Sequence, residues 1–128
     1  MGIYGFILVF IGGGLGSALR HGVNMLALRL VGTAYPWGTL AINVLGAFVM
    51  GLVVEWFALR ASLPQSARLF LTTGILGGFT TFSTYALEIG MLYERGDWLA
   101  SMAYALGSLV LGVAALFAGL GLVRMLAP

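Results

Sequence analysis

The chain has 128 residues, of which 61% are hydrophobic and only 8% are charged. Ordinary soluble domains carry about 25% charged residues, so this composition excludes a water-soluble domain and indicates that lipid is the natural solvent. The net charge of +2 rests on six scattered arginines, which excludes a nucleic-acid interface, and the absence of cysteine excludes disulfides, thiolate nucleophiles and sulfur-bound metals.

Four apolar runs are long enough to cross a membrane. A bilayer core about 30 Å thick needs roughly 20 residues of apolar helix. Dividing the sequence at its charges and prolines leaves four such runs, at residues 3–28, 37–59, 67–93 and 98–125. The connections are so short that neighbouring helices must be antiparallel and no extramembrane domain fits. We therefore expect one all-α transmembrane domain, residues 1–128, made of four helices with both chain ends on one side.

The ends of these runs carry ordinary boundary signals. Pro36 lies before the second run and Pro64 before the third, and proline suits the start of a helix. Asp97 is the expected N-cap of the fourth helix. The first basic residue is Arg20, so the N-terminus lacks the charged segment of a cleavable signal peptide, and we expect the first run to remain in the mature protein.

The first run combines a glycine-rich segment with an arginine at depth. Gly12 and Gly16 form a small-xxx-small pair, which favours close packing against another helix. Arg20 follows one turn later, where an unpaired guanidinium costs about 2.5 to 3.5 kcal/mol on insertion scales. Its side chain either extends to the interface or faces an aqueous vestibule that attracts anions. His21 has no acid or second histidine at helical spacing, so we assign it no metal.

The second run places Thr39 and Asn43 on one helix face, four residues apart. The amide of Asn43 supplies two N–H donors. These donors serve either a hydrogen bond between helices or a substrate path, and the sequence leaves both open. Glu55 lies near the end of this run and is expected at the membrane interface.

The third run is predicted to break. Between Leu76 and Ala86 it carries two glycines and four Ser/Thr hydroxyls at mid-membrane depth. Glycine weakens a helix, and clustered hydroxyls can bond freed carbonyls, so we expect an interruption at the bilayer centre. Non-helical backbone at that depth is tolerated only beside protein or a water-filled cavity, and it marks ion sites in transporters. Exposed carbonyls suit a cation such as Na⁺, whereas N–H groups and hydroxyls suit an anion.

The fourth run carries a stripe of hydroxyls. Ser101, Tyr104 and Ser108 recur at helical spacing and share one face. Hydrogen bonds between helices remain one explanation for such a stripe. The other is that these hydroxyls line a path through the membrane.

Polar and aromatic side chains from the last three runs together suggest such a path. Its candidate lining residues are Thr39, Asn43, Phe82, Ser83, Tyr85, Tyr104 and Ser108. The set offers hydroxyl and amide donors but no lysine, and the edges of aromatic rings carry partial positive charge that can also face an anion. The pattern fits a small dehydrated anion better than a cation.

The arginines give almost no bias in orientation. Three fall at the end of the predicted bundle that holds the termini and two at the opposite end, with Arg20 set aside. The positive-inside rule then permits insertion in both directions, and the two forms could pair as an antiparallel homodimer. The alternative is that lipid charge or the first helix fixes a single orientation. Four spans are also too few to enclose a solute path, which is a second reason to expect a dimer.

Three motifs resemble those of the CrcB/Fluc fluoride channels. They are GGLGSALR at residues 13–20, GTLAINVLG at 38–46 and GILGGFTTFST at 74–84. The resemblance covers the whole chain in length, number of spans and order of motifs. It implies a dual-topology antiparallel homodimer in the bacterial inner membrane, which exports cytoplasmic fluoride passively through two pores.

The same resemblance implies where ions bind. A structural Na⁺ is implied at the dimer centre, held by the backbone carbonyls of Gly77 and Thr80 of each subunit. The positions implied to line the anion path are Asn43, Phe82, Tyr85, Tyr104 and Ser108. Arg20 matches a motif arginine expected near the vestibule. The family usually has Phe at both aromatic positions of the third helix, whereas the second here is Tyr85, whose hydroxyl could donate to the anion or block it.

Other function classes fit the residues less well. The alternative is a proton-coupled small-solute or multidrug exporter of dual topology, which needs a membrane-embedded carboxylate, and Glu88 is the one candidate. A scaffold bundle would use the glycine packing but leaves the donor-rich third run unexplained. An enzyme is the weakest option, because no residue spacing offers a nucleophile and its base.

Overall fold

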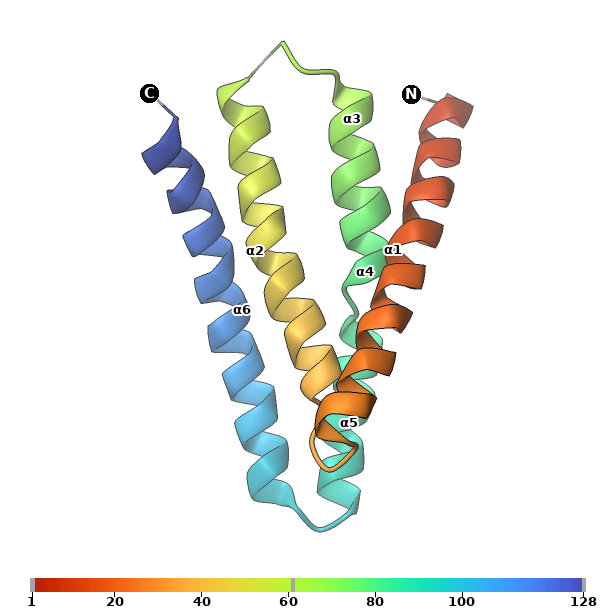
Figure 1. Ribbon diagram of the computed structural model, residues 1–128, viewed down its shortest axis with the longest axis vertical. Coiled ribbons are helices and arrows are strands. Elements are labelled where there is room, and N and C mark those ends of the chain that lie inside the picture. The colour runs from red at the N-terminus through yellow and green to blue at the C-terminus, as the bar shows by residue number, and fades with distance from the viewer. Residues whose placement is uncertain (1, 61, 128) are drawn as a thin grey trace.

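The computed structural model describes residues 2–60 and 62–127, and throughout this part of the chain the regular structure is helical. Figure 1 shows the helices as a bundle with both ends of the chain at the same end of the molecule. The elements in chain order are α1 (Gly2–Val31), α2 (Trp37–Leu59), α3 (Gln65–Leu69), the π-helix η1 (Phe70–Leu76), α4 (Gly77–Phe79), α5 (Phe82–Glu94) and α6 (Trp98–Leu126).

Three of these helices, α1, α2 and α6, are long and apolar enough to cross a membrane. The bounds of α2 match the prediction, whereas α1 begins one residue earlier and extends to Val31, and α6 ends one residue later. The expected third run is divided into α3, η1 and α4 before the interruption and α5 after it. Asp97 caps α6 as predicted, because its carboxylate accepts a hydrogen bond from the backbone N–H of Ala100.

Glycines allow α1 to lie directly against η1 and α4. A Cβ atom on Gly12 would lie 2.9 Å from Cα of Gly74, and one on Gly78 would lie 2.9 Å from Cα of Gly13. A Cβ on Gly16 would meet the carbonyl oxygen of Ile75. Real Cβ atoms do not approach other atoms so closely, so these helices can touch only where the side chain is absent. The close packing predicted from Gly12 and Gly16 is confirmed.

The second close contact joins α2 and α6. A Cβ atom on Gly51 would lie 3.1 Å from Cα of Gly119, and a Cβ atom on Gly119 would lie 3.1 Å from Cα of Gly51. Beyond this crossing, Arg124 Nε donates to Glu55 Oε2, which is the ion pair found within the described residues. The α2–α6 pair is therefore held by glycine contact at one crossing and by opposite charges near its end.

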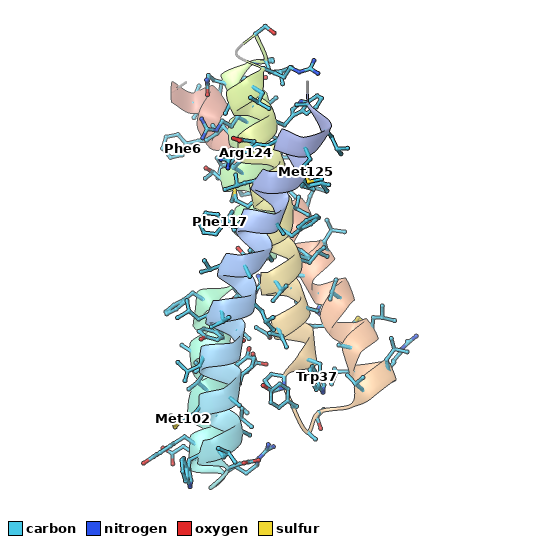
Figure 2. The ribbon with its side chains drawn as sticks, turned by 90° about the vertical axis from the view of Figure 1, so that its left-hand side faces the viewer. Phe6, Trp37, Met102, Phe117, Arg124 and Met125 are labelled. Atoms are coloured by element: carbon cyan, nitrogen blue, oxygen red, sulfur yellow. The ribbon has the colours of Figure 1, made fainter. Side chains whose placement is uncertain are left out.

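The outer surface of the bundle is apolar. Figure 2 shows Phe6, Met102 and Phe117 pointing away from the helices, and they are 76%, 52% and 63% exposed. The side chains that are almost completely buried are few, with Tyr104, Ile42 and Thr39 the largest of them. A surface of this kind is suited to lipid or to another protein and not to water.

Candidate functional site

The interruption between α4 and α5 consists of two extended residues. Thr80 has φ −82° and ψ 158°, and Thr81 has φ −149° and ψ 121°. The break is narrower than the sequence predicts, since Gly77 and Gly78 are helical and Phe82 begins α5. The reason is that Gly78 packs on Gly13 of α1, so this glycine serves close helix contact instead of loosening the backbone.

A single side chain replaces the backbone hydrogen bonds that the interruption removes. Asn43 Oδ1 accepts from the N–H of Thr81 at 2.9 Å, and Asn43 Nδ2 donates to the carbonyl of Thr81 at 3.0 Å. The Thr81 hydroxyl accepts from the N–H of Thr84 at 3.2 Å and thereby caps α5. Asn43 on α2 thus holds the extended peptide as a neighbouring β-strand would.

Because of these hydrogen bonds, two backbone carbonyls lack the N–H donors that they would have in a continuous helix. The N–H of Thr81 would donate to the carbonyl of Gly77, and the N–H of Thr84 to the carbonyl of Thr80. Both N–H groups instead donate to side-chain oxygens. The carbonyls of Gly77 and Thr80 are therefore left without their helical donors, and Gly77 is exposed on the protomer surface.

Aromatic rings run from the interruption toward the α1–α2 loop. The ring centroids of Phe82 and Tyr85 are 5.8 Å apart, those of Tyr85 and Tyr104 are 5.3 Å apart, and those of Tyr104 and Tyr35 are 5.6 Å apart. Phe82, at 79% exposed, is the open end of this series, while Tyr104 is 1% exposed. The structure therefore brings three of the predicted aromatic residues together and adds Tyr35.

The three residues of the hydroxyl stripe on α6 differ in their hydrogen-bond partners. Ser101 Oγ donates to the carbonyl of Ile89 at 2.8 Å, so it joins α6 to α5. Tyr104 donates to Glu88 Oε1 at 3.1 Å. Ser108 Oγ is buried and has no hydrogen-bond partner within the described residues. A buried hydroxyl without a partner is costly, which makes Ser108 the stripe residue most in need of a ligand or another chain.

Three further predicted residues lie in different surroundings. Thr39 is 2% exposed on α2, whereas Ser83 is exposed, with its hydroxyl 3.5 Å from that of Thr81. The Nε atom of Arg20 is buried and has no partner within the described part of the chain. The predicted residues thus differ in burial and in their hydrogen-bond partners.

A cavity of about 320 Å³ lies between the α1–α2 loop and α5. Its lining includes Thr39 and Thr84 beside the interruption, and Tyr35, Glu88 and Arg95 farther out. Motifs and residue spacing did not predict Tyr35, Thr84 or Arg95 as site residues. One signal was available, since Glu88 and Arg95 are seven residues apart and so share a helix face. Placing the loop across that face requires the tertiary structure.

The hydroxyl of Tyr85 donates to the carbonyl of Ala105 at 2.5 Å. Because this hydroxyl is engaged with the backbone of α6, we expect Tyr85→Phe to cost about 1 kcal/mol of stability. Thermal unfolding in detergent measures this loss. An unchanged unfolding midpoint would contradict a stabilising role for this hydrogen bond.

The family model described as CrcB-like protein, Camphor Resistance (CrcB), matches residues 7–120. A "Fluoride-specific ion channel FluC 2" from Nitrobacter hamburgensis is 54% identical over 121 residues, which are 94% of this chain and 98% of the relative. A "Fluoride-specific ion channel FluC" from Methylobacterium nodulans is 55% identical over 92% of this chain and 94% of its own length. One from Granulibacter bethesdensis is 55% identical over 94% of this chain and 95% of its own length.

Proposed function

The chain belongs to the CrcB family, and on that basis we propose that it is a fluoride-selective ion channel through which cytoplasmic fluoride leaves passively down its electrochemical gradient. The observation that carries the proposal is the near-complete match to relatives named fluoride-specific channels at 54% and 55% identity. The expected benefit to the cell is a lower internal fluoride concentration. Because those relatives are named ion channels, no enzymatic activity is proposed.

The proposed path uses donors that can replace the water around fluoride. Its lining residues are Thr39, Asn43, Phe82, Ser83, Tyr85, Tyr104 and Ser108, with Arg20 at the vestibule. The amide nitrogen of Asn43 has a second hydrogen beyond the one used by Thr81, and Ser108 offers a buried hydroxyl without a partner. Donors of moderate strength without a lysine suit conduction, because an ion must leave as readily as it enters.

We propose that the working unit is an antiparallel homodimer of dual topology in the bacterial inner membrane, with residues 65–94 acting as a fourth, interrupted span. The exposed position of Phe82 supports this, since one protomer leaves that end of the aromatic series uncovered. The nearly even division of arginines between the two ends also supports it.

The proposed dimer holds a structural Na⁺ at its centre. The donor set fits, because the carbonyls of Gly77 and Thr80 lack their helical donors and hard cations prefer oxygen ligands. Two such carbonyls from each protomer would hold the ion. The ion would supply a fixed positive charge and a link between the subunits.

Replacing Na⁺ with K⁺ is expected to lower the thermal unfolding midpoint of the purified protein. A ligand present at 100 times its dissociation constant stabilises a folded state by about 2.7 kcal/mol. Thr80→Val keeps the backbone carbonyl, so this variant is the control that should retain the response to Na⁺. Equal midpoints in Na⁺, K⁺ and choline would exclude the sodium site.

The proposed function is tested by fluoride efflux from liposomes that contain the purified protein. A fluoride electrode follows efflux while K⁺ and valinomycin set the voltage, and chloride is the control anion. Rapid efflux of fluoride but not chloride, driven by voltage without a proton gradient, is the expected result. Efflux that requires a proton gradient would favour the exporter alternative with Glu88 as its carboxylate, and no efflux from folded dimers would exclude the channel.

A further inference from the structure

The cavity beside α5 is lined by the α1–α2 loop, which lies toward the end of the molecule opposite the termini (Figure 1). Thr39 and Thr84 form part of its inner wall. The α1–α2 loop and Arg95, which follows the last residue of α5, form its outer part. Since Thr39 is a residue of the proposed path, the cavity adjoins that path at one wall and the α1–α2 loop at another.

Two charged side chains line the cavity, Glu88 and Arg95. They are seven residues apart along one helix face, which is a rise of about 10 Å. Arg95 Nη2 donates to the carbonyl of Ala34 at 3.0 Å. This partner is neutral and Arg95 takes no part in the ion pair found within the described residues, so its positive charge is not compensated by a salt bridge.

The other charges near this end are mostly negative. Glu94 and Asp97 flank Arg95 in the same turn, and Asp97 caps α6. Arg29 lies in the last turn of α1 and is exposed, but it is not among the residues that line the cavity. An anion crossing the cavity would meet the carboxylate of Glu88 in the wall, with two more acids in the turn between α5 and α6, and such like charges repel it.

We propose that Arg95 is the countercharge that admits small anions such as fluoride through this cavity to the channel. The proposal rests on the proposed function, since it concerns access to the same path. The hydrogen bond to Ala34 keeps the guanidinium at the edge of the loop, where its field opposes that of the three acids. Arg95 is thus a residue that sets the rate of access without contacting the narrow part of the path.

The test compares Arg95→Gln with Arg95→Lys in the liposome assay at two ionic strengths. The Debye length is about 30 Å at 0.01 M salt and about 8 Å at 0.15 M, so salt screens an electrostatic effect. Arg95→Gln is expected to lower initial fluoride efflux by about three- to tenfold at the lower ionic strength and by less than about twofold at the higher one. Arg95→Lys keeps the charge and should match wild type.

Arg29→Gln is the matched control. It removes one positive charge at the same end of the helix bundle as Arg95, but Arg29 is not among the residues that line the cavity. It should change efflux less than Arg95→Gln. Equal losses in Arg95→Gln at both ionic strengths, or an equal loss in Arg95→Lys, would show that Arg95 only ties the loop to α5 and would overturn the proposal. Efflux from Arg95→Gln equal to that of wild type at both ionic strengths would also overturn the proposal, whereas absence of efflux in wild type would overturn the proposed function as well.

Discussion

Asn43→Asp is expected to reduce fluoride efflux by at least roughly 30-fold, the factor that corresponds to about 2 kcal/mol. The substitution keeps an acceptor for the N–H of Thr81 but removes the donor to the Thr81 carbonyl. Two oxygens would then face each other at the interruption, and a carboxylate would stand beside the proposed anion path. Efflux from liposomes gives the rate, and thermal unfolding gives the accompanying loss of stability.

Gln65→Glu is the control for this substitution. It makes the same change from amide to carboxylate at the exposed first residue of α3, where a negative charge suits the start of a helix. Efflux should be unchanged. Asn43→Ala removes both hydrogen bonds without adding charge. The loss of efflux in this variant therefore measures how much of the Asn43→Asp effect comes from the lost hydrogen bonds and not from the added charge. Undiminished efflux in Asn43→Asp would remove Asn43 from the mechanism.

Gly16→Ala is expected to destabilise the protein by about 3 kcal/mol or more, at or above the upper end of ordinary overpacking. The new Cβ would meet the carbonyl oxygen of Ile75 and lie 2.8 Å from the backbone nitrogen of Phe79. Both are main-chain atoms, which cannot rotate away as a flexible side chain can. The contact could be relieved only by moving α1 away from η1 and α4.

Gly14→Ala, on the same helix, is the matched control. Gly14 is exposed, and no heavy atom lies within 4 Å of the position of its Cβ. Alanine favours a helix over glycine by up to about 1 kcal/mol, so this variant should be as stable as wild type or slightly more so. Thermal unfolding in detergent compares the two variants. Similar midpoints for both would contradict the close contact at Gly16.

The long helices could be predicted from the positions of the apolar runs, because a membrane-spanning helix needs roughly 20 apolar residues. The bounds of α2 were predicted correctly, since Pro36 precedes it and the first charge after it is Arg60. The π-helical turn at Phe70–Leu76 was not predicted, because its residues, FLTTGIL, carry no signal that distinguishes a π-helix from an α-helix. Gly74 within this turn packs against Gly12, which is a tertiary contact.

The candidate site was predicted less completely than the fold. Residue spacing identified Asn43 and the hydroxyls near the interruption but left two roles open for Asn43. The structure shows the hydrogen bonds with Thr81 and leaves one amide hydrogen for a second partner, so the two roles are compatible. The contact of Tyr104 with Glu88 could not be predicted, because it joins residues from two helices whose relative rotation the sequence does not specify.

The interruption also has an electrical polarity. The helical run that ends at Phe79 presents its carbonyl end there, and α5 presents its N–H end a few residues away. Aligned peptide dipoles give such ends about half a negative and half a positive charge. The interruption therefore places the cation-attracting end of α4 close to the anion-attracting end of α5. The amide of Asn43 binds the extended residue Thr81 that separates these two ends. The proposed sodium affinity and the proposed anion conduction should consequently change together in any variant that reshapes this turn.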